Sequence, residues 1–352
     1  MPSRCIRHLG VLVLVAIISW GGRGAALAQA GGLSGVGLAD GAIEGLIATI
    51  AVGASPADVV VSPDGARLYV AHPAEDTLSV VDAVASAVVS TVAVGDQPVA
   101  LALSPDGTRL YVAHSATGQL TIIDTSTDTV AATLDVGAHA MDVAVSPDGA
   151  TVHVALGAGG VAVVEAAGKR LLATIPTGGF ASQLTASPDG ARVYVAVHGR
   201  EPPGPEVRAS PDRVGVIDAH AHTVIAFIEI GGAPAGLSGL TVTPDGTRLY
   251  AGSARSEHLA VIDTSALVEI SRSRIAALPV ALAVSPDGTQ LYVTNRMRGP
   301  VLVASTSGGR TAFINGVTRS AGVAVSPDGA RVYVTVPASG VVMVFETARV
   351  VG

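Results

Sequence analysis

The chain has little cysteine, few aromatic side chains, little charge and few long apolar runs. Of its 352 residues, one is cysteine, 3% are aromatic and 14% are charged. A single cysteine excludes a disulfide scaffold, a cysteine-based zinc ribbon and covalently attached c-type haem. No stretch of about 18 apolar residues occurs beyond the first thirty, so no integral membrane segment is expected after them.

The charge balance argues against a nucleic-acid partner. Lysine and arginine number 21 against 28 aspartate and glutamate residues, the net charge is −7, and Lys169 is the single lysine. Binding to a phosphate backbone needs a basic patch or stripe, which this composition does not supply. Net acidity keeps a protein soluble and implies no special partner.

The first thirty residues have the three parts of an export signal. Arg4 and Arg7 precede an apolar run over 11–20, and small residues at 26–28 or 28–30 provide a cleavage site. We predict a signal peptide over 1–30, a flexible leader over 31–44, and a periplasmic or secreted protein with no integral membrane segment after cleavage. The alternative is a retained membrane anchor. Cys5 precedes the apolar run, so a lipid anchor there is not expected.

One short motif recurs along the rest of the chain at a nearly constant interval. Ser-Pro-Asp-Gly, or Thr-Pro-Asp-Gly in one copy, begins at Ser62, Ser104, Ser146, Ser187, Thr243, Ser285 and Ser326. The aspartates are 42, 42, 41, 56, 42 and 41 residues apart. The long interval contains an insertion over 199–212, rich in proline and charge, that we expect to be an exposed loop.

The repeat predicts four antiparallel strands per unit. Proline presets the turn, aspartate and serine bond back to local amides, and glycine adopts a positive φ. Short β-branched, alternating segments flank each turn. Four strands in about 42 residues indicate one propeller blade, so we predict an all-β, seven-bladed β-propeller over 45–352 as a single domain.

The two ends of this region complement each other. The last unit stops after its third strand at 341–345, whereas 45–53 resembles a fourth strand without a unit of its own. We therefore predict that the N-terminal strand completes the last blade and closes the ring, which would remove two exposed sheet edges.

The repeat, including the literal sequence Tyr292-Val293-Thr294-Asn295, resembles the YVTN-family β-propeller repeat proteins. The resemblance covers roughly residues 45–346. It implies an exported or surface propeller, and because propellers serve both as binding modules and as enzymes, it implies no particular activity.

Tyrosine occupies one position of the second strand in six units, and His153 takes its place in the third unit. We expect each of these rings to pack between blades. The aspartates of the seven turns are assigned to backbone geometry and not to catalysis.

Three polar residues stand where small residues stand in the other units, at the start of the innermost strand. They are Asp58, Asp142 and Gln183, and the equivalent positions hold Ala100, Gly239, Ala281 and Gly322. One interpretation is a set of solvated loop-entry residues. The other is the rim of a ligand pocket where the loops of several blades converge.

Histidines gather at the same end of the blades in this prediction. His72 and His114 end the second strands of two units, and Asn295 holds that position in another. His198 lies one residue further along its unit, and His139 lies between two units. These rings either replace the asparagine of the family or form a divalent metal site, with His72, His114 and His139 as candidate ligands. No other cofactor is predicted.

We predict a monomeric binding or scaffold protein. Its partner would be a periplasmic or cell-surface protein, or a small ligand, bound on the face with His72, His114, His139 and residues 199–212. The alternative is an enzyme at the mouth of the channel, either a lactonase-like hydrolase or a metal-dependent oxidoreductase. The sequence contains no Gly-x-Ser-x-Gly elbow and no phosphate-binding loop, and no cysteine nucleophile would remain after cleavage.

Overall fold

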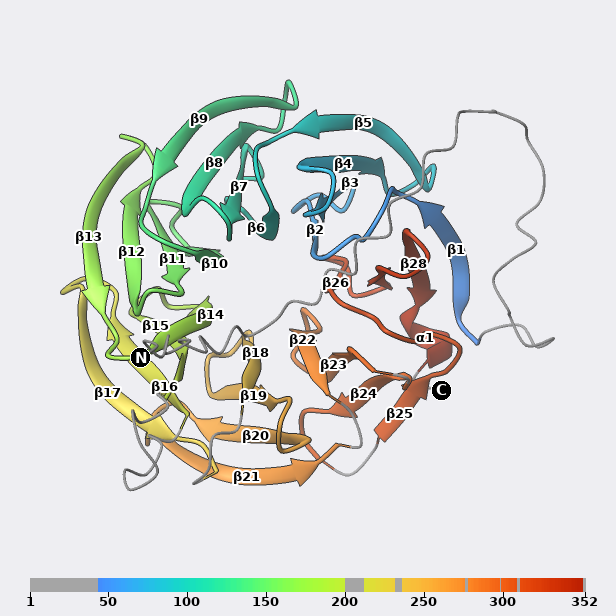
Figure 1. Cartoon of the computed structure of the whole chain (residues 1–352). Coiled ribbons are helices and arrows are strands. Elements are labelled where there is room, and N and C mark those ends of the chain that lie inside the picture. The colour runs from blue at the N-terminus through green and yellow to red at the C-terminus, as the bar shows by residue number, and fades with distance from the viewer. Residues whose placement is uncertain are drawn as a thin grey trace, which may run out of the picture. The chain divides into compact units, whose positions relative to one another are not determined.

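Each repeat folds into one four-stranded antiparallel sheet. The computed structural model describes residues 44–199, 212–231, 236–275, 278–297, 299–308 and 311–350. These residues form seven sheets, arranged as blades around a common axis (Figure 1). The predicted all-β, seven-bladed propeller is therefore confirmed.

The strands of the first three blades are consecutive in the chain and run from the axis outward (Figure 1). Blade 1 contains β2 (Val59–Val61), β3 (Arg67–His72), β4 (Thr77–Asp82) and β5 (Ala87–Ala93). Blade 2 contains β6 (Pro98–Leu103), β7 (Arg109–His114), β8 (Gln119–Asp124) and β9 (Thr129–Asp135). Blade 3 contains β10 (Ala140–Val145), β11 (Thr151–Leu156), β12 (Gly160–Glu165) and β13 (Arg170–Pro176).

The next three blades repeat this order. Blade 4 contains β14 (Phe180–Ala186), β15 (Arg192–His198), β16 (Arg213–Asp218) and β17 (Thr223–Glu229). Blade 5 contains β18 (Leu237–Val242), β19 (Arg248–Ser253), β20 (His258–Asp263) and β21 (Val268–Arg274). Blade 6 contains β22 (Pro279–Val284), β23 (Gln290–Asn295), β24 (Val301–Ser305) and β25 (Thr311–Ile314).

Blade 7 combines strands from both ends of the described chain. It contains β26 (Val323–Val325), β27 (Arg331–Val336), β28 (Val341–Glu346) and, outermost, β1 (Leu46–Ala51). β1 pairs antiparallel with β28, with Ile50 opposite Val342. That this pairing keeps the ring closed remains a prediction, which a truncation can test. After β28 comes the short helix α1 (Thr347–Val350), and no helix among the described residues is long and apolar enough to cross a membrane.

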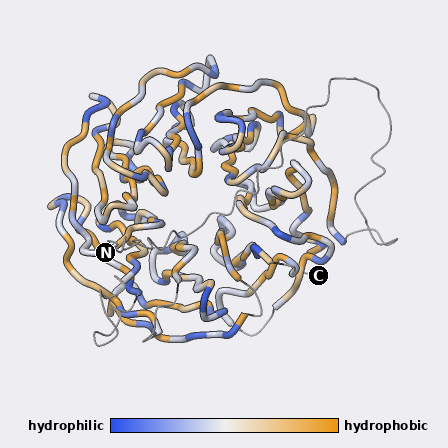
Figure 2. Tube along the Cα trace, viewed as in Figure 1, coloured by the Kyte–Doolittle hydropathy of each residue, from blue (hydrophilic) through white to orange (hydrophobic). Residues whose placement is uncertain are grey.

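The apolar core lies between the blades. The second and third strands of each blade are mostly buried, whereas the outermost strands are mostly exposed. Figure 2 shows the resulting recurrence of apolar stretches around the ring. The ring that was predicted to lie between blades is buried in every unit; these residues are Tyr69, Tyr111, His153, Tyr194, Tyr250, Tyr292 and Tyr333.

The recurrent turn is held by its own side chains, as the first copy shows. The Ser62 hydroxyl donates to the Asp64 carboxylate at 2.5 Å, and the same carboxylate accepts from the Ala66 amide at 2.9 Å. Gly65 has a φ of 72°, which favours glycine. The hydrogen bond from Ser62 holds the pKa of Asp64 below its ordinary value, and the other turn aspartates behave in the same way.

An arginine at the start of the second strand ties most blades to the next one. Its guanidinium donates to a backbone carbonyl in the hairpin between the third and fourth strands of the following blade. The pairs are Arg67 with Thr125, Arg109 with Ala166, Arg192 with Thr264, Arg248 with Thr306 and Arg331 with Ala83. Blades 3 and 6 have Thr151 and Gln290 at this position and therefore lack the tie.

Candidate functional site

The two ends of the ring have different chemistry. We call the end with the blade-to-blade connections the crossing face, and the end with the Ser-Pro-Asp-Gly turns the turn face. The innermost strands start at the crossing face. One alternating position of these strands is partly exposed in all seven blades, so solvent reaches the axis; its residues are Val60, Ala102, Ala144, Thr185, Thr241, Ala283 and Ala324.

Asp58 and Asp142 lie at this axial mouth and make the same contacts in blades 1 and 3. One carboxylate oxygen of Asp58 accepts from the Val59 amide at 2.8 Å, and the other accepts from the Leu101 amide of blade 2 at 2.9 Å. Asp142 likewise accepts from the Val143 amide and, at 2.9 Å, from the Leu184 amide of blade 4. Each carboxylate therefore joins neighbouring blades at the axis, which corrects the view of these residues as solvated loop entries.

The surroundings of these two carboxyls disfavour their charge. Burial raises the pKa of Asp58 to about 6, and burial together with the negative charge of Asp58 raises the pKa of Asp142 to about 7, although backbone amides oppose both shifts. Both residues remain partly accessible to solvent, but dense protein around the axis keeps water from fully solvating the charge. The two groups therefore titrate near neutral pH and influence each other.

Gln183 reaches across the ring from blade 4. Its Nε2 donates to the Val280 carbonyl of blade 6 over 3.5 Å, while its Oε1 is buried without a hydrogen-bond partner. Because Asp142 binds the Leu184 amide next to Gln183, the structure brings two of the three predicted rim residues together. An unpaired buried amide oxygen is costly, so it is a ready acceptor for a ligand.

His72 and His114 end β3 and β7 as predicted, but both rings are buried and both have two hydrogen-bond partners. His72 contacts the Ala54 carbonyl through Nδ1 at 3.1 Å and the Ser79 hydroxyl through Nε2 at 2.9 Å. His114 contacts the Asp96 carbonyl and the Thr121 hydroxyl in the same way. These rings hold the crossing segments, so they offer no free nitrogen to a ligand.

Asn295 has the same structural role in blade 6. Its side-chain oxygen accepts from the Leu278 amide of the crossing segment at 3.2 Å and from the Met297 amide at 3.1 Å. The side chain is buried. This supports the interpretation that the histidines replace the family's asparagine.

His139 and His198 are the more accessible members of the set. His139 is exposed, has a φ of 58° and contacts the Ser115 carbonyl at 3.1 Å. His198 is partly exposed, contacts the Ser182 hydroxyl at 2.8 Å and lies 3.5 Å from the Asp212 carboxylate. Of the predicted insertion, residues 200–211 lie outside the described part of the chain.

The metal candidates are not gathered into a site. Over the ranges that the structure describes, no three histidine, cysteine, aspartate or glutamate side chains are placed to hold a metal ion together. His72 and His114 each contact the segment that crosses into their own blade, and His139, which lies in a crossing segment, contacts the Ser115 carbonyl in the hairpin between β7 and β8.

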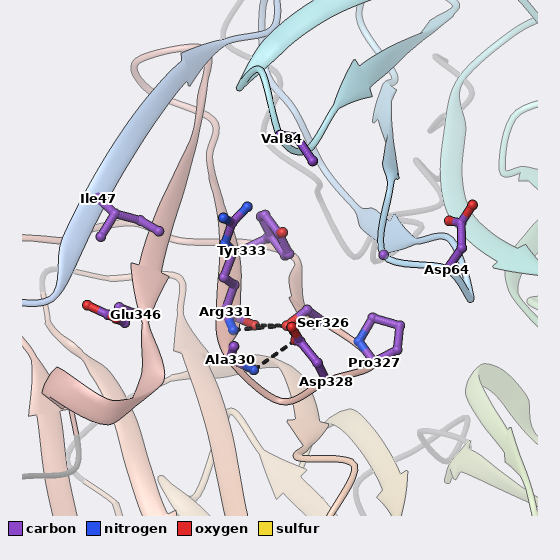
Figure 3. Close-up of a pocket in the computed structure, with 11 residues that line it drawn as sticks. Ile47, Asp64, Val84, Ser326, Pro327, Asp328, Ala330, Arg331, Tyr333 and Glu346 are labelled. Carbon is purple, nitrogen blue, oxygen red and sulfur yellow. Dashed lines mark hydrogen bonds between the residues drawn. The ribbon is translucent and has the colours of Figure 1, made fainter.

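A groove that the sequence did not predict lies on the turn face between blades 7 and 1. It encloses about 540 Å³ and is lined by Ile47, Val84, Tyr333 and two repeats of the turn (Figure 3). Its aspartates are bonded within their own turns, and Arg331 is bonded to blade 1. Because these polar groups belong to the repeated architecture, the axial mouth is the better candidate site.

Comparison with known proteins shows the fold. The model of the family described as "Lactonase, 7-bladed beta-propeller" matches residues 40–146, less than half of the chain. No curated protein matches. The seven-bladed structure and the family match support the predicted resemblance to YVTN-type β-propeller repeat proteins.

Solved propellers are similar in architecture and distant in sequence. Hydrazine synthase of Kuenenia stuttgartiensis is 21% identical, with a TM-score of 0.75 over 84% of this chain and 97% of that chain. The β-propeller domain of Cps50 (Swd1) of Myceliophteria thermophila is 14% identical, with a TM-score of 0.72 over 86% of this chain and 99% of that chain. Such distances establish the propeller and no shared activity.

Proposed function

We propose that this propeller is an exported binding module that takes a small cationic ligand at the axial mouth. Asp58, Asp142 and Gln183 would provide the contacts. Export rests on the predicted signal over 1–30, and N-terminal sequencing of the processed protein tests it. The site itself rests on the geometry of the mouth.

The observation that carries the proposal is a pair of carboxyls held without a counter-charge. Within the described residues, the charge that acts on Asp142 is that of Asp58, and no basic side chain contributes to the pKa of either group. A bound cation would relieve both the burial cost and the mutual repulsion. The unpaired Oε1 of Gln183, whose side chain extends from blade 4 toward blade 6, adds a neutral oxygen.

This donor set consists of oxygen atoms, which suits an ammonium group or a hard metal ion such as calcium. Thermal unfolding of the protein in calcium chloride and in 1,4-diaminobutane separates these two forms of cation. We expect one of them to raise the melting temperature at pH 8 and to act less at pH 5. The sign follows because falling pH protonates Asp142 and then Asp58, and neutral carboxyls attract cations weakly.

Two variants locate the effect. Asp142→Ala introduces the residue that blade 2 already has as Ala100, and it should abolish the stabilisation by the cation. Asp106→Ala removes a carboxylate of the turn face and should leave the stabilisation unchanged. The proposal fails if neither cation stabilises the wild type, or if both variants respond alike.

Hydrolysis of a lactone is the second candidate function, and one observation favours it. The match to the lactonase family model over 40–146 includes both Asp58 and Asp142. A carboxylate with a pKa of about 7 could take a proton from water while the water oxygen attacks the lactone carbonyl. The ring C–O bond would then break, and the leaving oxygen would take up a proton, giving a hydroxy acid. Acid release from a simple lactone, lost in Asp142→Ala, would support this function.

A further inference from the structure

Two departures from the repeat meet at one interface between blades. Blade 3 has His153 where the other six blades have tyrosine. Blade 4 has His220 and His222 in the hairpin between β16 and β17, and no other blade has histidine in this hairpin. The second-strand ring of each blade packs against the following blade, as Tyr250 does when it donates to Thr306. His153 therefore faces blade 4, and its charge interaction with His222 agrees with this placement.

His153 is enclosed without polar partners. The side chain has 0% of its surface exposed, and neither ring nitrogen has a hydrogen-bond partner. It stands opposite Ala144 of β10 and Val163 of β12. Burying an unpaired imidazole is costly in its neutral form and far more costly when charged.

The blade 3–4 interface also lacks the tie that joins most blades. Thr151 stands where five blades have the arginine that donates to the next hairpin. Apolar packing remains, since Val163 of blade 3 belongs to the same buried cluster as Ile217 and Ala219 of blade 4. The interface is therefore held by packing on the turn-face side and by the Asp142–Leu184 contact at the axis.

The charged groups around His153 come from both blades. On its own blade, Asp148 lies in the turn and Glu165 ends β12, where it pairs with Arg170. In blade 4, Arg192 begins β15 opposite Asp218, which precedes the hairpin of His220 and His222. β10 and β14 present no further ionisable group on the turn-face side. Asp148 favours a proton on His153, whereas His222 opposes it.

We infer that the interface between blades 3 and 4 is an acid-sensitive joint, which opens when His153 takes up a proton. Opening would expose the imidazole to water and separate it from His222. The same event would release the edge of blade 3 that carries Asp142, so the joint links the turn face to the axial mouth.

The closed and open forms of the interface differ in the pKa of His153. Burial, with a smaller contribution from the charge of His222, lowers the pKa of His153 to about 4 in the closed form. An exposed imidazole has a pKa of about 6.5, so below this value the open form binds more protons than the closed form. The open fraction therefore rises as the pH falls from about 6.5 to about 4, by about a hundredfold over pH 7 to 4. Below that range the effect levels off.

Hydrogen exchange measured peptide by peptide tests this inference on the intact chain. After correction for intrinsic exchange, we expect protection of β11 and β16 to fall by about a hundredfold between pH 7 and pH 4, while β7 and β8 serve as the internal reference. His153→Tyr restores the repeat residue and should remove most of this loss. His153→Phe serves if the tyrosine variant does not fold.

Substitution of a tyrosine by histidine at another interface tests the inference without changing His153. Tyr111→His places an imidazole in the blade 2–3 interface and should create an acid-dependent loss of protection in β7 and β12. Acid-induced opening that persists in both His153 variants would overturn the inference. Opening of the blade 3–4 interface at pH 7 after addition of EDTA would also overturn the inference. The acid effect would then be explained by loss of a bound metal ion and not by protonation of His153.

Discussion

Two neighbouring interfaces of the ring differ in their polar contacts but not in their packing. Between blades 2 and 3, Arg109 donates to the Ala166 carbonyl at 2.6 Å, and Tyr111 lies buried in an apolar cluster from both blades. Between blades 3 and 4, Thr151 and His153 occupy the equivalent positions, yet a comparable apolar cluster forms. Apolar burial therefore suffices to join two blades, and the polar residue sets how firmly, and at which pH, they stay joined.

The largest loss of stability is expected when a whole strand, and not a single polar contact, is removed. A chain that begins at Ala54 lacks β1, and with it the buried Ile50 and Val52 and the bond from the Val52 amide to Gly340. Burial of two such side chains contributes about 4 kcal/mol, so we expect thermal unfolding about 10 °C lower.

The matched control is a chain that begins at Glu44 and keeps β1. Ile47→Ala in that chain adds a second control, because Ile47 is 45% exposed on the same strand. Equal melting temperatures for the two truncated chains would contradict closure of the ring by β1.

The next test concerns the crossing face, where His72 holds the segment that enters blade 1. His72→Ala leaves the Ser79 hydroxyl and the Ala54 carbonyl without this partner and opens a cavity, which should cost about 2 to 4 kcal/mol in free energy of unfolding. His72→Asn should cost less, since Asn295 performs this role in blade 6. Chemical denaturation measures both, and stabilisation by a cation at the axial mouth should be unchanged in His72→Asn.

Sequence periodicity predicted the architecture because turn chemistry and alternation are local. The Ser62-Pro63-Asp64-Gly65 turn and its copies follow from residues within reach of one another, so their number gives the number of blades. The candidate site is harder to predict from the sequence, because the exposure of each side chain depends on contacts with residues far away in the chain. His72 is buried by contacts with residues 54 and 79, and nothing in its own strand indicates them.

The axial residues and His153 show what a repeat can reveal and what it hides. Asp58, Asp142 and His153 stood out as departures from the small or aromatic residue of the repeat. Their partners did not, because Leu101 and Leu184 contribute backbone amides, which leave no trace in the sequence. Both His153 and His222 depart from the repeat in the sequence. That they lie near each other follows only from the order of the blades in the structure.

The smallest effect is expected when the arginine–carbonyl hydrogen bond is removed from the blade 2–3 interface and introduced into the blade 3–4 interface. Arg109→Ala removes a charged donor from the Ala166 carbonyl and should lower the free energy of unfolding by about 1 kcal/mol. Thr151→Arg supplies the missing donor to blade 4 and should raise it by up to about 1 kcal/mol, less the cost of ordering the side chain. Because the two sites have separate partners, the double variant should lie near the wild type, as denaturant titration can show. A destabilised Thr151→Arg would mean that the hairpin with His220 and His222 has no room for the guanidinium, and the two interfaces would then differ in shape as well as in polar contacts.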